Sequence, residues 1–150
     1  MTDTKRNRRA LLLLPALLAA ALLTALTVTL TLRLSDRTYT LHLPSSVDLA
    51  EVVVKQGERE AHIAGWEQIG AVTGLLLGND RTTRRESVQD APAGAENVIQ
   101  FELIFSGGGG STLFAYEKRD QYWLEQPYNG IYALSREEFD ALLALLSEMA

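Results

Sequence analysis

The length, charge and cysteine content of this chain exclude several classes of protein before any motif is considered. Its 150 residues leave room for one domain, and because it has no cysteine it forms neither disulfides nor thiolate metal sites. The net charge is −5, and from residue 34 onward 18 acidic side chains stand against 9 basic ones, which disfavours a nucleic-acid partner.

The N-terminal segment has the composition of a membrane anchor. Residues 1–9 carry four basic side chains, and residues 10–32 then run 23 positions without a charge. As a helix such a stretch spans about 34 Å, slightly more than the roughly 30 Å hydrocarbon core of a bilayer. Since basic residues stay on the cytoplasmic side, we predict a cytoplasmic tail (1–9), a transmembrane signal-anchor helix (10–32) and an extracytoplasmic C-terminal part.

A cleaved secretory signal peptide is the alternative reading of this segment. Its n-region is also basic, but its apolar core is usually only about 7 to 15 residues long. Cleavage after Ala19-Ala20-Ala21 would also leave a mature chain that begins with the apolar residues 22–32. The uncleaved anchor is therefore the preferred prediction.

The first strands are expected soon after the anchor. Residues 33–47 are predicted to form a membrane-proximal linker that includes one strand, because residues 38–43 alternate between apolar and polar side chains. Valine-rich residues 49–55 and residues 59–64 then flank a glycine-containing turn, which is typical of a β-hairpin.

A helix is expected next, over Trp66 to Leu77. Its apolar residues recur at steps of three and four, which places them on one helical face. Gly78-Asn79 is an αL-tolerant pair and predicts the C-terminal end of this helix. The polar residues 79–96 that follow are expected to form a long irregular connection.

A three-stranded meander is predicted from residue 99 onward. Residues 99–105 alternate strictly, four glycines separate them from a second strand at residues 111–119, and residues 122–126 form the third. A short edge strand is expected at residues 131–133. Asn129-Gly130 is expected to supply the positive φ angles of the tight turn before it.

The last helix has the clearest N-terminal signal in the chain. Ser135 followed by Glu138 forms a capping box, and an apolar stripe begins at Phe139. The sequence thus predicts a transmembrane helix followed, over residues 48–150, by a small α+β domain. Counted from the strand in the linker, the order is β-ββ-α-βββ-α, with two helices packed on a mostly antiparallel sheet.

Common catalytic and cofactor motifs are missing from this sequence. The glycines at 107–110 lack the lysine of a phosphate-binding P-loop, and His42 and His62 do not have the spacing of a zinc site. No serine lies in a nucleophile elbow. We therefore expect no cofactor and no metal, and assign no catalytic residue.

Five residues remain as candidates for a binding or catalytic role. Trp123, Tyr128 and Tyr132 are expected to present an aromatic surface, because tyrosine and tryptophan are enriched at interface hot spots. Asp90 and Glu125 lie among turn-forming and aromatic residues, and a pair of acids near aromatic rings is what glycan hydrolysis needs. Without that pairing, Asp90 is expected to cap its own loop and Glu125 to face solvent.

Three segments resemble a family of uncharacterised extracytoplasmic domains, found mainly in low-GC Gram-positive bacteria behind a signal peptide or membrane anchor. The segments are "ESVQDAP" (86–92), "STLFAYEK" (111–118) and "YWLEQPYNGIY" (122–132). The family pattern has a first motif, Ser-Val-x-Asp-x-Pro (residues 87–92), and a second motif, Tyr-x-x-Glu-Gln-Pro-Tyr-x-Gly-Ile-Tyr (residues 122–132). The matching positions are Ser87, Val88, Asp90, Pro92, Tyr122, Glu125, Gln126, Pro127, Tyr128, Gly130, Ile131 and Tyr132. The resemblance would cover about residues 38–145, and it implies location and fold without implying an activity.

Three functions are compatible with these features. The preferred one is a membrane-anchored extracytoplasmic domain that binds an envelope protein or a peptide through the aromatic surface, without nucleic acid and without catalysis. The alternatives are a cell-envelope glycan hydrolase that uses Asp90 and Glu125, and a regulatory subunit of a membrane complex.

Overall fold

The structure, a computed structural model, describes residues 19–30 and 37–148. The chain divides into two units between residues 37 and 38. Within the first unit, residues 19–30 are helical, and they belong to the span predicted at residues 10–32. The basic tail at residues 1–9 and the rest of that span lie outside the described residues. Over the described ranges, no helix combines the length and apolar character needed to cross a membrane.

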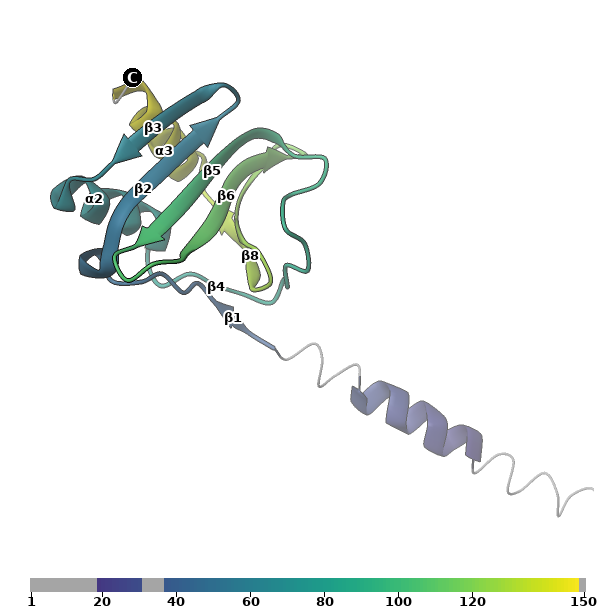
Figure 1. The fold of residues 1–150 in the computed structure, drawn as a ribbon. Helices are drawn as coiled ribbons and strands as arrows, with labels where there is room; N and C mark the ends of the chain where they lie inside the picture. The colour runs from purple at the N-terminus through teal and green to yellow at the C-terminus, as the bar shows by residue number, and fades with distance from the viewer. Residues whose placement is uncertain (1–18, 31–36, 149–150) are drawn as a thin grey trace, which may run out of the picture. The chain divides into compact units, whose positions relative to one another are not determined.

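The second unit is built on a six-stranded sheet in which every neighbouring pair is antiparallel (Figure 1). The strand order across the sheet is β3-β2-β5-β6-β7-β8. Its strands are β2 (Leu49–Gln56), β3 (Arg59–Ile63), β5 (Glu96–Phe105), β6 (Gly110–Lys118), β7 (Gln121–Gln126) and β8 (Gly130–Leu134). The predicted α+β class is confirmed, and the short strand expected near residue 131 forms one edge of the sheet.

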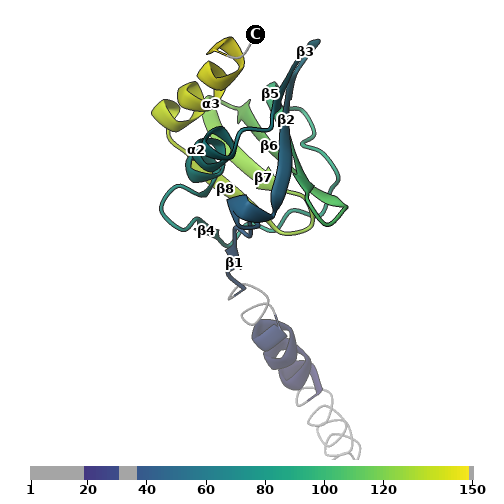
Figure 2. The same cartoon turned by 60° about the vertical axis from the view of Figure 1, so that its left-hand side comes forward.

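Two helices cover one face of this sheet (Figure 2). They are α2 (Trp66–Leu77) and α3 (Arg136–Glu148), and we call the sheet surface beneath them the helix face. The opposite surface is the loop face, because residues 84–95 cross part of it. The main core lies on the helix face. Its fully buried members include Val52, Val54, Ile69, Leu76, Phe101, Leu103, Leu124 and Leu142.

Helix α2 has the bounds that the sequence predicts. Ile69, Val72, Thr73 and Leu76 are its buried residues, which is the spacing of three and four that points one face of a helix into a core. Gly78 ends the helix at φ 53°, a left-handed value that glycine adopts without the Cβ penalty.

The capping box of α3 is confirmed. The backbone N–H of Ser135 donates to Glu138 Oε2 at 2.7 Å, and the N–H of Glu138 donates to Ser135 Oγ at 3.1 Å. The Tyr122 ring stacks on Phe139 with centroids 4.8 Å apart, and Arg136 Nε donates to the Tyr122 hydroxyl at 3.0 Å. The first tyrosine of the second motif therefore anchors α3 to β7.

Removing the Glu138 charge is expected to make the stability of the domain less sensitive to acid. Burial acts to raise the pKa of Glu138, but hydrogen bonds from Arg81 and Ser135 and the charge of Arg81 outweigh it, so the pKa is lowered. The stabilisation is thus present above the ordinary value of 4.5 and lost as the pH falls through the folded-state pKa. Chemical unfolding between pH ~6 and pH ~3 should show a smaller loss for Glu138→Gln than for the wild type. Parallel curves for the two proteins would contradict this.

The first predicted strand is shorter than expected and does not join the main sheet. Only β1 (Tyr39–Thr40) forms, and it pairs with β4 (Thr82–Thr83) in a separate two-stranded sheet. A short 3₁₀ helix, η1 (Ser46–Asp48), follows. Leu41 is nevertheless buried, as the alternation predicts. The strand ends early because a side chain from the end of β7 binds the backbone beyond it.

Candidate functional site

Glu125 is a fully buried carboxylate on the loop face. Alternation along β7 places Leu124 in the core and Glu125 on the opposite surface, where we expected solvent. Glu125 is instead 0% exposed, because residues 84–95 cover it. The expectation of a solvent-facing side chain is therefore wrong, and the burial of its charge needs a physical explanation.

Three neutral donors satisfy the Glu125 carboxylate. Ser87 Oγ donates to Oε1 at 2.6 Å, and Gln89 Nε2 donates to the same oxygen at 3.3 Å. The Tyr116 hydroxyl, from β6, donates to Oε2 at 3.0 Å. A buried charge is tolerated only when it is hydrogen-bonded in this way. Burial raises the pKa of the Tyr116 hydroxyl far above its usual value, and the negative charge of Glu125 and the hydrogen bond to it act in the same direction. The positive charge of Arg85 acts in the opposite direction.

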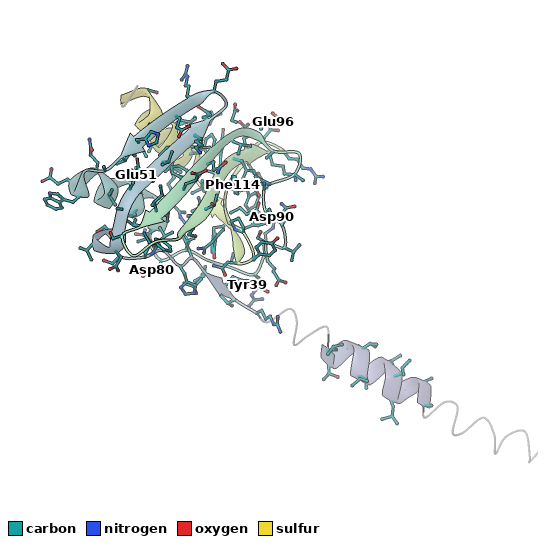
Figure 3. All side chains as sticks on the ribbon, viewed as in Figure 1. Tyr39, Glu51, Asp80, Asp90, Glu96 and Phe114 are labelled. Atoms are coloured by element: carbon teal, nitrogen blue, oxygen red, sulfur yellow. The ribbon has the colours of Figure 1, made fainter. Side chains whose placement is uncertain are left out.

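Further contacts hold the two motif segments together. Asp90 accepts a hydrogen bond from the Tyr128 hydroxyl at 2.6 Å, and Figure 3 labels Asp90 on the connection between β4 and β5. The Ser87 N–H donates to the Asn129 carbonyl at 3.2 Å, and the Ile131 N–H donates to the Arg85 carbonyl at 2.9 Å. The loop thus pairs with the turn and edge strand that follow β7.

Two amides of the second motif bind the N-terminal segment. The Gln126 side chain donates to the His42 carbonyl at 2.8 Å and accepts from the His42 N–H at 3.2 Å. Asn129 Nδ2 donates to the Thr40 carbonyl at 2.8 Å. Gln126 therefore takes the hydrogen-bonding position of a neighbouring strand, which explains why β1 stops at Thr40.

The turn before β8 differs from the one we expected. The positive φ belongs to Tyr128, at 58°, and not to Asn129 or Gly130. Gly130 is needed for space instead, since a Cβ there would lie 2.8 Å from the Tyr132 hydroxyl and 2.8 Å from Thr83 Cγ2. Tyr132 itself is 1% exposed. It packs in the core and contributes nothing to the aromatic surface where we expected it.

Gly130→Ala and Gly74→Ala are expected to change stability in opposite directions. An alanine Cβ at position 130 would overlap a core tyrosine, which typically costs about 1 to 3 kcal/mol. A Cβ at Gly74, inside α2, meets nothing within 4 Å, so alanine there should stabilise the helix by up to about 1 kcal/mol. Thermal unfolding of both variants measures the difference, and equal shifts would contradict the close approach at Gly130.

A pocket of about 280 Å³ opens on the loop face beside Glu125. Arg85 lies over the Trp123 ring, 4.2 Å from its centroid, and both side chains line the pocket. Gln89 from the loop also lines the pocket, and so do Lys118 at the end of β6 and Arg119 in the turn after it. Across residues 37–148, no ion pair involves Arg85, Lys118 or Arg119. The pocket therefore offers positive charge to a ligand.

The structure distributes the five candidate residues over different environments. Trp123 lines the pocket, Tyr128 is 68% exposed outside it, and Asp90 is exposed and bonded to Tyr128. Glu125 and Tyr132 are buried. The segments that carry Asp90 and Glu125 are docked together, but the two carboxylates bind different hydrogen-bond partners.

Sequence reasoning missed most of the pocket lining. In the sequence, Arg85 is one of three arginines within the polar residues 79–96, and Lys118-Arg119 simply precede a turn. The available signal was charge: these residues are three of the nine basic side chains of an acidic domain. Among the described residues, no group of three or more histidine, aspartate or glutamate side chains is placed to hold a metal.

Comparison with protein families identifies the domain. The sequence model of a family described as a domain of unknown function (DUF5300) matches residues 37–133. The chain belongs to this family. The match to the DUF5300 family contains both motif segments and stops within β8, before α3. No curated protein and no solved structure matches the chain.

Proposed function

We propose that this protein is a membrane-anchored binding domain, and that its folded part lies outside the cytoplasm and binds its partner on the loop face. The observation that carries the proposal is the buried Glu125. It ties residues 84–95 to β7 and thereby leaves Trp123 and three cations around one pocket.

The internal bonding of the described N-terminal helix supports the anchor. Thr24 Oγ1 donates to the Ala20 carbonyl at 3.1 Å, and Thr27 Oγ1 donates to the Leu23 carbonyl at 3.1 Å. These hydroxyls are thus satisfied within the helix itself, as a lipid environment requires. The basic residues before residue 10 favour a cytoplasmic N-terminus.

Binding fits this geometry better than glycan hydrolysis does. A general acid or nucleophile has to reach the scissile bond, whereas Glu125 is 0% exposed and its oxygens accept three hydrogen bonds. A fixed loop over a strongly bonded carboxylate is instead a preorganised surface, which lowers the entropy cost of binding.

Site-specific photocrosslinking in native membranes tests the proposal. Val88 on the loop is 74% exposed and Val47 on η1 is 82% exposed, so a photoreactive residue at either position should leave the fold intact. We expect an adduct, detected by mass spectrometry of the purified full chain, from position 88 and not from position 47. Trp123→Ala should reduce that adduct. No adduct at position 88, or the same adducts at both positions, would overturn the proposal.

A further inference from the structure

We propose that the pocket on the loop face binds the phosphate group of its ligand; this inference rests on the proposed function, that the loop face is a binding surface. The pocket is lined by Arg85 from the loop and by Lys118 and Arg119 from the end of β6 and the turn after it. Residues far apart in the sequence thus bring cations to one place.

The charge distribution singles out this pocket. From residue 34 onward the chain carries 9 basic and 18 acidic side chains, yet three of the nine line the pocket and none of the lining residues is a carboxylate. Other cations of the domain are used internally, for example Arg81 with Glu138 at 2.6 Å and Lys55 with Glu102 at 2.9 Å. Positive charge that is concentrated without a carboxylate to pair with attracts an anion from solution.

Arg85 and Lys118 are held by contacts and keep donors available. The Arg85 guanidinium stacks on Trp123, which restrains it by a cation–π interaction of about 0.5 to 1 kcal/mol and leaves its N–H edge free to donate. Lys118 Nζ donates one proton to the Ala93 carbonyl at 2.6 Å, and an ammonium has two more. The backbone of Arg119 has a φ of 56° in the turn, and this backbone conformation sets the direction in which its side chain leaves the chain.

Amide donors complete the lining. Gln89 and Gln121 both reach the pocket, and the first of them is positioned by its bond to Glu125. The Tyr116 hydroxyl donates to Glu125, so it adds no donor for an anion. The ligand group is therefore met by guanidinium, ammonium and amide N–H donors, which suit the several oxygens of a phosphate.

Size and charge favour a phosphate over an acidic peptide. The pocket volume is about 280 Å³, which admits one compact group with a small attached moiety. A phosphate concentrates up to two negative charges in that space. An acidic peptide would spread its carboxylates over a domain that is itself acidic and would be repelled there.

Titration calorimetry with inorganic phosphate on the full chain in an uncharged detergent tests this inference. We expect saturable binding that Arg85→Gln and Arg119→Asn each weaken at least about tenfold, the loss of one charge-assisted contact. Asparagine is chosen at position 119 because it tolerates a positive φ. Arg84→Gln is the matched control, since Arg84 is an exposed neighbour that is absent from the pocket lining. No binding, or equal weakening by all three variants, would overturn the inference.

Three further probes identify the source of the phosphate. Glycerol 3-phosphate represents a soluble ligand, and phosphatidic acid in mixed micelles represents a lipid headgroup. If either one binds more tightly than inorganic phosphate, with the same dependence on Arg85, the result supports the inference. Tetraglutamate binding as tightly as phosphate would overturn it. A failure of the phosphate inference can be told apart from a failure of the proposed function, because the crosslinked adduct at position 88 is measured without any phosphate probe.

Discussion

Replacing Glu125 by leucine is expected to lower the free energy of unfolding of the domain by about 3 kcal/mol, because buried hydrogen-bond donors left without an acceptor cost about 1 to 3 kcal/mol each. The Ser87 and Tyr116 side chains, 2% and 3% exposed, would lose the carboxylate that they bind. For a domain of this size the melting temperature should fall by roughly 10 to 15 °C. Thermal and chemical unfolding of the full chain measure both quantities.

Two controls separate lost hydrogen bonds from lost charge. Glu125→Gln keeps the shape and one acceptor, and the Tyr116 hydroxyl can accept from its new amide, so the expected loss is only about 1 kcal/mol. Glu102→Leu removes a partly exposed carboxylate from β5, and its ion pair with Lys55 contributes little because solvent screens it. If Glu125→Leu were no worse than Glu102→Leu, the buried carboxylate would not hold the loop.

Arg81→Met is expected to destabilise the domain by a similar amount, about 3 kcal/mol, because hydrogen bonds from a charged donor contribute about 1.5 to 3 kcal/mol. The side chain of Arg81 is only 9% exposed, and its guanidinium donates to the Leu75 and Leu76 carbonyls at 3.3 and 2.8 Å, at the C-terminal end of α2. It also reaches the Ala133 carbonyl at 3.2 Å and Glu138 at 2.6 Å. One side chain thus joins α2, β8 and α3.

Arg84→Met is the matched control for this prediction. Arg84 lies in the same connection and is exposed, so its replacement should change stability by less than about 0.5 kcal/mol. Denaturant unfolding of the two variants should differ clearly in midpoint at the same slope. Similar midpoints would show that the helix contacts of Arg81 do not contribute to stability.

The elements with strong local signals were predictable from the sequence. The bounds of α2 follow from apolar spacing and from Gly78, and the capping box of α3 is read directly from Ser135 and Glu138. Strict alternation likewise determined the faces of β5 and β7. In each case neighbouring residues determine the outcome, so no distant contact is needed to derive it.

The surroundings of the candidate residues depend on distant contacts and were not predictable. Alternation correctly puts Glu125 opposite Leu124, but only the docking of residues 84–95 decides that this surface is buried. The same holds for β1, which is cut short by side chains of the second motif. Local sequence patterns determine on which face of the sheet a side chain lies. Long connections determine whether that face is exposed to solvent.

The pocket was hidden from sequence analysis for a related reason. Arg85 is far from Lys118 and Arg119 in the chain, and no spacing rule links an irregular connection to a hairpin turn. Only the bonds that dock the loop, such as that from Ile131 to the Arg85 carbonyl, bring these cations together. Their positive charge within a mostly acidic domain is visible in the sequence, but their convergence is not.

Amide hydrogen exchange at Ser87 and Ile131 tests most directly whether Glu125 and the second motif hold residues 84–95 on the sheet. Both N–H groups donate across the junction of the two segments. In the full chain they should exchange at least about 100-fold more slowly than in an unstructured peptide. In Ser87→Ala, the amides at positions 87 and 131 should exchange at least about tenfold faster than in the wild type, while those of β5 stay unchanged. Unprotected amides at both positions in the wild type, or an equal change throughout β5, would contradict the docked loop on which the proposed binding site depends.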